Sequence, residues 1–259
     1  MKILYISKSI IPSRAANSIH VMKMCQAFAD NGHKVTLIAP KEKKKYEKDI
    51  PDIYDYYDVK KNFDIIKLIH PSFKGGALLY LISIFFYLLF NVRFDLVYGR
   101  FLHGIYVATL LKNKTIYETH SPISNKNDHR SFIFSKLIKS KYLIKMIVIS
   151  QALKNIYLNE GHLNEHKIEV AHDGADKVDN LESKIELLGE QNSLKVGYVG
   201  HLYKGRGIET IIECAKQLSN VTFHLVGGLK EDIEYWKSYS KNYNLNNIFF
   251  YGFVSPKKA

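Results

Sequence analysis

The sequence predicts an α/β protein made of two doubly wound domains, each a parallel sheet with helices on its faces. Three observations predict this fold class. Short apolar or β-branched runs alternate with helical patterns over residues 2–171, and the same alternation restarts at residue 194 after a polar stretch. Such βαβα alternation is typical of parallel sheets. The length of 259 residues is sufficient for two ordinary domains.

The first domain is expected over residues 1–176. Its strands are the short runs rich in β-branched and apolar residues, at 2–7, 34–39, 64–69, 94–98, 114–118, 144–149 and 167–171. Its helices show apolar residues at helical spacing, at 17–31, 76–91, 101–112, 129–140 and 150–159.

The second domain is expected over residues 194–259. It follows an acidic and polar stretch, 177–193, which we interpret as a linker or a connecting helix. The strands are expected at 194–200, 221–226 and 247–251, and the helices at 206–218 and 230–243. Three strands and two helices form half of a doubly wound sheet, with an exposed edge and unpaired apolar faces. We therefore expect this domain to be incomplete in the chain.

The composition indicates a globular protein with a real core. Hydrophobic residues make up 46% of the chain and charged residues 24%. Two distant cysteines, Cys25 and Cys214, exclude a disulfide scaffold and fit a reducing compartment. Residues 1–6 form a strand-like run without the long apolar region and cleavage site of a signal peptide. We therefore expect a cytoplasmic protein.

The net charge of +12 is unevenly distributed. Residues 1–150 hold 24 Lys and Arg against 11 Asp and Glu, whereas residues 151–259 hold 13 against 14. This asymmetry indicates that the first half faces an anionic partner, either a membrane surface or nucleic acid, unless it is only a solvated lysine-rich surface. Nucleic acid is disfavoured because the basic residues form no recognisable motif.

One segment is unusually apolar. Ala77–Phe90 contains 14 residues without a charge, flanked by Lys74 and Arg93. Spanning a bilayer needs about 20 apolar residues, so a transmembrane helix is not expected. Two interpretations stay open: a helix buried against the sheet, or a helix lying in the membrane interface.

Ligands of open α/β sheets bind at the carboxyl ends of the strands, so the loops there are the candidate sites. After the first strand, the loop of residues 7–17, which contains Ala16 and Asn17, leads into a helix that starts with Ser18. The backbone N–H groups at this helix start are available to an anion, although Asn17 or Ser18 in the role of a helix cap is the alternative. The absence of G-x-G-x-x-G argues against a dinucleotide dehydrogenase. After the fifth strand, His120 is placed to bind a sugar hydroxyl or transfer a proton, unless it is only structural.

The second domain offers a glycine-rich loop. Gly200–Gly207 directly precedes a helix, and Lys204 and Arg206 add positive charge there. Glycines allow close backbone approach and a helix N-terminus favours phosphate, so we predict a diphosphate-binding loop that is not a P-loop. The chain contains no Asp-x-Asp and no His or Cys cluster with zinc spacing. We therefore expect no metal site.

Five segments resemble the group 1 glycosyltransferases, a large family of retaining enzymes with the GT-B fold. They correspond, in order, to the opening βαβ unit, the turn that ends the acceptor domain, the start of the donor domain and two later donor-domain motifs: 16–38, 168–176, 196–212, 225–228 and 250–254. Their order and spacing make the resemblance specific. It implies two Rossmann-like domains, the first binding the acceptor and the second the nucleotide sugar.

The resemblance also implies roles for individual residues. His120 matches the histidine near the reacting sugar and is the candidate catalytic residue. Lys204 matches the lysine that holds the donor diphosphate, and His201 stands where the family often has arginine. The other donor-side candidates are Gly205, Arg206, Gly227, Phe253 and Val254. The acceptor-side candidates are Ala16, which replaces a usual glycine, Asn17, Ser18, Asp173, which replaces a usual asparagine, and Gly174.

The implied function is transfer of a sugar from a UDP- or GDP-linked donor to a lipid-linked or polysaccharide acceptor in cell-surface glycan biosynthesis. The resemblance also implies that the reaction retains the anomeric configuration and needs neither a metal ion nor another cofactor. The expected partners are the nucleotide sugar, the acceptor and the anionic inner face of the membrane, without nucleic acid. Two alternatives remain. One is an inactive or binding-only truncated remnant, because the family's later donor-contacting glutamates are absent. The other is a GT-B nucleotide-sugar epimerase, for which the apolar segment and the basic half would have no purpose.

Overall fold

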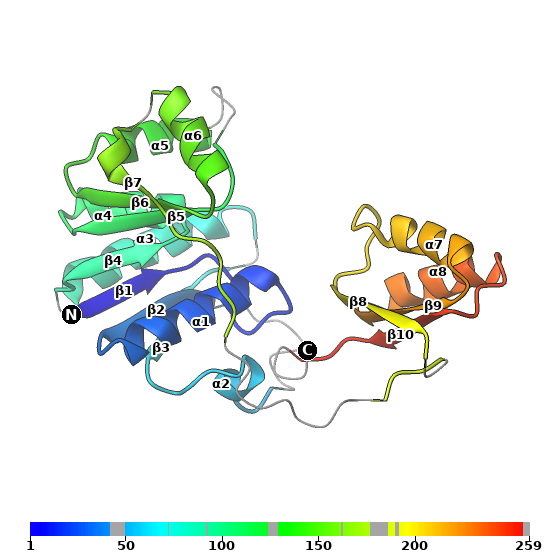
Figure 1. The fold of residues 1–259 in the computed structure, drawn as a ribbon. Coiled ribbons are helices and arrows are strands. Elements are labelled where there is room, and N and C mark those ends of the chain that lie inside the picture. Colours follow the sequence, from blue (N-terminus) through cyan, green and yellow to red (C-terminus); the bar gives the residue numbers. More distant parts are fainter. Residues whose placement is uncertain are drawn as a thin grey trace. The chain divides into compact units, whose positions relative to one another are not determined.

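The computed structural model of the chain describes residues 1–41, 50–71, 73–91, 93–123, 129–161, 163–176, 186–189 and 192–255. The chain folds into two compact units, Met1–Ala175 and Asp176–Ala259 (Figure 1). Most of the expected linker, 177–193, lies outside the described residues.

The first unit is built on a parallel sheet with the strand order β3-β2-β1-β4-β5-β6-β7. Along the chain the order first runs outward from β1 to β3 and then continues on the other side of β1 from β4 to β7. The direction therefore reverses between β1 and β4, which pair directly. The strands are β1 (Lys2–Ile6), β2 (Lys34–Lys41), β3 (Asp64–Ile69), β4 (Leu96–Gly99), β5 (Thr115–Thr119), β6 (Leu143–Val148) and β7 (Ile168–Val170).

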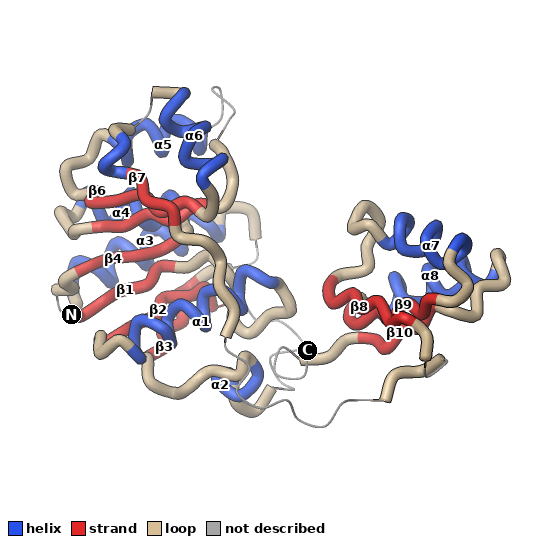
Figure 2. The backbone as a smooth tube through the Cα atoms, viewed as in Figure 1, coloured by secondary structure: helices blue, strands red, loops and turns tan. Residues whose placement is uncertain are grey.

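Helices cover both faces of this sheet (Figure 2). Successive side chains of a strand point to opposite faces. In β1, Ile3 and Tyr5 pack into one buried cluster with α1, whereas Leu4 and Ile6 pack into the other. The helices are α1 (Ala16–Asp30), α2 (Ile53–Tyr56), α3 (Gly76–Phe90), α4 (Leu102–Leu110), α5 (His129–Ile138) and α6 (Gln151–Asn159), with the short 3-10 helix η2 (Glu165–Lys167) before β7.

The apolar segment forms α3 and has two different faces. Tyr80 and Ile84 are fully buried in the cluster that holds Leu4 and Ile6. This confirms a helix packed on the sheet. The opposite face of α3 stays apolar and exposed, with Leu78, Leu79, Ile82, Phe86, Leu89 and Phe90 between 38% and 76% accessible. None of the described helices has the length and apolar content needed to cross a bilayer.

The second unit contains a parallel sheet in the order β10-β9-β8. Its described elements are β8 (Leu194–Gly200), α7 (Ile208–Gln217), β9 (Val221–Gly227), α8 (Lys230–Lys241) and β10 (Ile248–Gly252). Ile208, Ile212 and Trp236 bring the two helices onto the sheet in one buried cluster.

The two-unit α/β fold predicted from the sequence is confirmed. Every expected strand and helix is present, and its ends lie within two residues of the expected bounds. The short helix α2 was not expected. The carboxylate of Asp52 accepts hydrogen bonds from the backbone N–H groups of Tyr54 and Asp55 and caps this single turn.

Candidate functional site

Glu118 is the centre of a buried polar cluster at the carboxyl end of β5. Its side chain is only 3% exposed. The Tyr98 hydroxyl, from neighbouring β4, donates a hydrogen bond to Oε2 at 2.6 Å. His120 Nε2 lies 2.5 Å from Oε1, within hydrogen-bond distance. The parallel pairing of β4 with β5 places Tyr98 beside the strand that carries both Glu118 and His120.

Two further cationic or ionisable groups approach the same oxygen. His20 Nε2, from the first turns of α1, lies 2.8 Å from Glu118 Oε1, and Arg100 Nε lies 3.8 Å from it. The rings of His20 and His120 meet edge to face, with centroids 5.0 Å apart. The carboxylate therefore gathers two imidazoles and a guanidinium from three elements.

The surroundings of Glu118 change its acidity. Burial by itself would raise the pKa of this carboxyl group, because it disfavours the charged form. The contacts with His20, Tyr98 and His120 act in the opposite direction and outweigh burial, so the pKa falls from 4.5 to about 2. Glu118 is consequently ionised at neutral pH and holds the ring of His120 next to it.

Asp173 and Gly174 follow β7 and lie beside this cluster. Asp173 Oδ1 is 3.7 Å from His20 Nδ1 and 3.8 Å from His120 Nε2. In the described part of the chain, His20, His120 and Asp173 form the one group of side chains close enough to hold a metal ion, with ligand atoms within 4.8 Å of one another. Gly174 is exposed, and a Cβ atom added there would have no other group within 4 Å.

The N-cap of α1 is neither Asn17 nor Ser18, the two residues that the sequence offered for this role. Ala15 is the N-cap residue and no side chain caps the helix. Ser18 is fully buried, and its hydroxyl donates to the carbonyl oxygen of Ala15 at 2.7 Å. It also lies 2.9 Å from the hydroxyl of Tyr57. This side chain therefore fixes the loop before α1, whereas Asn17 lines a cavity beside the Glu118 cluster. Ala16 is exposed at the first position of the helix.

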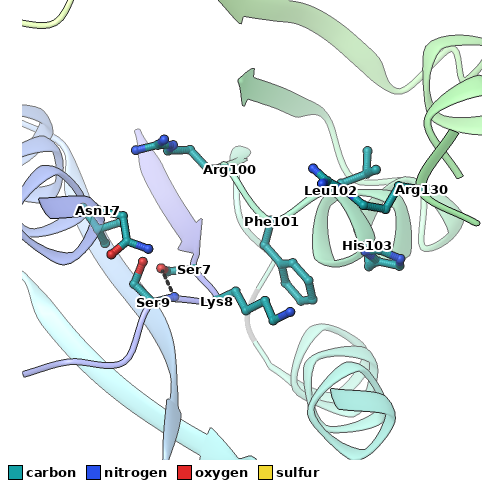
Figure 3. Close-up of a pocket in the computed structure, with 10 residues that line it drawn as sticks. Ser7, Lys8, Ser9, Asn17, Arg100, Phe101, Leu102, His103 and Arg130 are labelled. Carbon is teal, nitrogen blue, oxygen red and sulfur yellow. Dashed lines mark hydrogen bonds between the residues drawn. The ribbon is translucent and has the colours of Figure 1, made fainter. Parts of the chain in front are cut away.

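The cavity lies at the carboxyl ends of β1 and β4 and has a volume of about 540 Å³. Figure 3 shows its lining from opposite sides: the loop after β1 and the start of α1 on one, and α4 with α5 on the other. The lining residues are Ser7, Lys8, Ser9, Asn17, Val21, Arg100, Phe101, Leu102, His103 and Arg130. Ligands of open α/β sheets bind where the strand order reverses, which is the position of this cavity.

The second unit gathers the predicted donor residues at one edge of its sheet. The three strands are parallel, so their carboxyl ends lie at the same edge. The loop from His201 to Gly207 follows β8, Gly227 ends β9, and Phe253 with Val254 follows β10. The topology therefore brings all three predicted segments to the same edge.

The loop after β8 is firmly anchored. Leu202 is fully buried, and its carbonyl oxygen accepts a hydrogen bond from Trp236 Nε1 at 2.5 Å. The carbonyl oxygen of His201 accepts one from the hydroxyl of Tyr198 at 2.8 Å. Gly205 and Gly207 both have φ of +85°, which favours glycine. The N-cap Gly207 leaves the start of α7 without a side-chain cap.

Cationic side chains of this loop lie over tyrosine rings. Lys204 Nζ is 4.5 Å from the ring centre of Tyr235, and Arg206 Cζ is 5.1 Å from that of Tyr203. Gly227 is required by packing, because an added Cβ would lie 2.1 Å from the carbonyl oxygen of Gly200. Phe253 is 39% exposed at the same edge.

Several residues of the first unit were not predicted as site residues from the sequence. Glu118 lies two residues before the predicted His120, and the available signal was its position as a charged residue inside an otherwise uncharged strand. His20 lies on the helix that carries the predicted Asn17. Lys8, Arg100 and Arg130 carry no local pattern, because they converge only when β1, β4 and α5 are assembled.

Comparison with known protein families identifies the family of this chain. Residues 18–178 match the sequence profile of Glycosyltransferase Family 4. The chain belongs to Glycosyltransferase Family 4. The resemblance predicted from the five segments is thereby confirmed, and the matched residues include His20, Glu118, His120 and Asp173.

A curated relative is an uncharacterised glycosyltransferase from Methanocaldococcus jannaschii, 30% identical over 203 residues. The match covers 67% of this chain and 50% of the relative. The chain thus spans about half the length of this curated relative.

Solved structures support the GT-B fold. Sucrose-phosphate synthase from Thermosynechococcus elongatus superposes with a TM-score of 0.73 at 16% identity, covering 99% of this chain and 71% of that one. HepE from Anabaena, in a crystal structure with UDP and glucose, gives a TM-score of 0.65 at 15% identity. This match covers 99% of this chain and 70% of the HepE chain.

Proposed function

We propose that this family 4 protein transfers a sugar from a UDP- or GDP-linked donor to a lipid-linked or polysaccharide acceptor. The observation that carries the proposal is the convergence of the glycine-rich loop, Gly227 and Phe253 at one edge of the second sheet. This edge has the composition that a nucleoside diphosphate needs: positive charge, closely approachable backbone and an aromatic side chain. The UDP bound to the structurally similar HepE supports the same ligand class.

The donor diphosphate would bind at the start of α7. Backbone N–H groups there have no side-chain cap, and the helix dipole favours negative charge. Lys204 and Arg206 supply cationic donors beside them. Their tyrosine contacts restrict these side chains before the ligand arrives, which reduces the entropy lost on binding.

In the first unit, His120 would contact the reacting sugar. The buried carboxylate of Glu118 orients its ring, in the way that a second group orients a catalytic histidine. Departure of the nucleoside diphosphate develops negative charge, which the loop cations and the α7 dipole would stabilise. Such electrostatic stabilisation requires no metal, and we propose that the reaction retains configuration and is metal-independent.

Incubation with a panel of UDP- and GDP-sugars and with lipid and glycan acceptors tests this function. Product NMR should give an acceptor-linked sugar with the anomeric configuration of the donor, and EDTA should leave the rate unchanged. Inversion, or loss of activity with EDTA, would overturn retention or metal independence. A C2-epimerised nucleotide sugar formed without acceptor would indicate the epimerase alternative, and UDP binding without turnover would indicate a binding-only protein.

The proposal extends to the anionic inner face of the cytoplasmic membrane. The outer face of α3 carries exposed Phe86 and Phe90 at 49% and 76% accessibility. Lys74 and Arg93, close to the two ends of this helix, are also exposed. An apolar helix face with adjacent cations is typical of interfacial binding, where each basic residue near the surface contributes about 1 kcal/mol.

Vesicle co-sedimentation tests the membrane proposal. The protein should bind vesicles containing phosphatidylglycerol, ignore pure phosphatidylcholine, and be released largely by high salt. Replacing Phe86 and Phe90 with serine should abolish binding while the protein stays folded. The matched control is Leu218→Ser, which removes a 44% exposed side chain from the second unit and should keep binding. A folded protein that sediments with neither vesicle would overturn the proposal.

A further inference from the structure

We propose that the cavity at the carboxyl ends of β1 and β4 binds a phosphate group carried by the acceptor. This inference rests on the proposed function, since it names the chemical class of the acceptor, but the binding can be measured without sugar transfer. The volume of about 540 Å³ is within the range of about 300–1,000 Å³ found for small-molecule sites. It accommodates a sugar phosphate or the head of a lipid phosphate.

Charge is the first argument for a phosphate. Three cationic side chains line the cavity from three separate elements: Lys8 from the loop after β1, Arg100 from the end of β4, and Arg130 from the first turn of α5 (Figure 3). Among the described residues that line it, there is no aspartate or glutamate. Arg100 also lies 3.8 Å from the Glu118 carboxylate, so the cavity joins three cationic side chains to one buried carboxylate behind it. Arginine also matches phosphate oxygens with paired N–H donors.

The cavity wall is fixed before a ligand binds. Phe101 is 8% exposed and stacks on Tyr80, with ring centres 5.9 Å apart. The Tyr80 hydroxyl donates to the carbonyl oxygen of Ser7 at 2.5 Å, which holds the loop that carries Lys8. Lys8 Nζ lies 5.9 Å from the centre of the Phe101 ring. This packing holds the loop that carries Lys8 next to the first turn of α4.

A histidine pair extends the polar wall. His103, which lines the cavity, stacks on His129 with ring centres 5.4 Å apart and an interplanar angle of 10°. His129 directly precedes Arg130 at the start of α5. His103 Nε2 and His129 Nδ1 lie 3.4 Å apart within the pair. An imidazole N–H group can donate to a phosphate oxygen, so His103 adds a polar group to the guanidinium groups of the lining.

Arg100 connects the cavity to the Glu118 cluster. Its Nε lies 3.8 Å from Glu118 Oε1, the oxygen that His120 Nε2 approaches at 2.5 Å. A phosphate bound by Arg100 therefore anchors the acceptor next to the proposed catalytic histidine. A binding group remote from the reacting atoms commonly contributes to catalysis in this way, by holding the substrate in position.

Calorimetry with small phosphate probes tests the inference. The probes are glucose 1-phosphate and farnesyl phosphate, with glucose as the uncharged comparison and UDP as the donor-site ligand. We expect at least one phosphate probe to bind and glucose to give no measurable heat. Lys8→Ala and Arg130→Ala should each weaken phosphate binding about tenfold or more, as for a lost charge-assisted contact. Both side chains are exposed, so these variants should keep the wild-type melting temperature.

Lys114→Ala is the matched control. It removes an exposed lysine from the amino-terminal edge of the same sheet, next to β5 and away from the cavity, and it should leave phosphate affinity within about twofold.

Binding of farnesyl phosphate alone would identify a lipid phosphate, and binding of glucose 1-phosphate alone a soluble one. Each of these results supports the inference.

The inference is overturned if neither phosphate binds, or if folded Lys8→Ala and Arg130→Ala bind both phosphates as the wild type does. UDP separates this outcome from failure of the proposed function. Lys204→Ala should weaken UDP and leave the phosphate probes unaffected, whereas the cavity variants should do the reverse. Normal UDP binding without binding of either phosphate probe would overturn only the inference that the acceptor carries a phosphate. The proposed sugar transfer would be unaffected.

Discussion

The ring of His120 and the carboxylate of Glu118 form a hydrogen-bonded pair, with 2.5 Å between His120 Nε2 and Glu118 Oε1. The two residues are separated by one position at the end of β5, so their side chains leave the strand on the same side. Because the Glu118 side chain is 3% exposed and that of His120 is 18% exposed, the carboxylate lies behind the histidine. The buried acid thereby determines the orientation of the accessible base.

Glu118→Gln should lower turnover by about 10²-fold or more, within the usual range for an acid–base or positioning contribution, and leave UDP affinity unchanged. Glutamine keeps the size of the side chain but loses the charge that holds His120. Tyr98→Phe removes only the hydrogen bond to Oε2 and should have a smaller effect in the same direction. Rates and UDP affinities of the two variants check this. Wild-type turnover in folded Glu118→Gln would contradict a positioning role.

The lowered pKa of Glu118 predicts a specific loss of stability in acid. The folded-state pKa is about 2 against an ordinary 4.5, so the unfolded chain binds this proton first as the pH falls. The contribution is complete above pH 4.5 and is lost as the pH falls toward 2. It amounts to about 3 kcal/mol, as an order of magnitude.

Denaturant unfolding at several pH values checks this loss. The stability difference between the wild type and Glu118→Gln should stay at its full value above about pH 5 and should shrink steadily toward pH 2.5. A difference that stays constant over this range would show that the pKa is not lowered in the folded state.

His120→Ala should reduce turnover much more than it changes donor affinity, because His120 lies in the first unit, to which we assign the acceptor in the proposed function. The expected loss is about 10²–10⁴-fold, typical of a removed acid, base or positioning group. The His20→Ala variant is the comparison, since His20 contacts the same carboxylate from α1 and should affect the rate less. Equal turnover of wild type and His120→Ala would leave this histidine with a structural role only.

Lys204→Ala should weaken UDP or GDP binding by about 1.5–3 kcal/mol, the usual contribution of a charged hydrogen bond. Lys216→Ala is a matched control. Its ammonium also lies over tyrosine rings, those of Tyr239 and Tyr243, but it is carried by α7 beyond the glycine-rich loop. Calorimetry should show normal affinity for the control. Unchanged nucleotide affinity in Lys204→Ala would remove this lysine from the donor site.

Gly227→Ala should destabilise the second unit by about 2 kcal/mol or more. The φ angle of +114° is strained for any residue with a Cβ, and that atom would lie 2.1 Å from the carbonyl oxygen of Gly200. Gly197→Ala, on neighbouring β8, is the control, because no atom lies within 4 Å of the added Cβ. Thermal unfolding checks both variants, and equal melting temperatures would show that the backbone between β8 and β9 can shift.

The sequence by itself determined the strands, the helices and their division into two units. These features depend on local periodicity, because apolar spacing of two or of about 3.6 residues is repeated within each element. The family was also accessible, since its motifs are continuous in sequence. His120 and Lys204 could be singled out because each follows a strand that the pattern reveals.

Only the tertiary structure decided how distant residues meet. Glu118 becomes a buried acceptor because β4 supplies Tyr98 and α1 supplies His20, positions 20 and 98 residues away along the chain. The cationic cavity forms because the strand order reverses between β1 and β4, which brings Lys8 and Arg100 from the ends of these neighbouring strands into the lining of one cavity. No local pattern records such a juxtaposition. It follows from strand order and helix packing, which are set by burial of both faces of the sheet together.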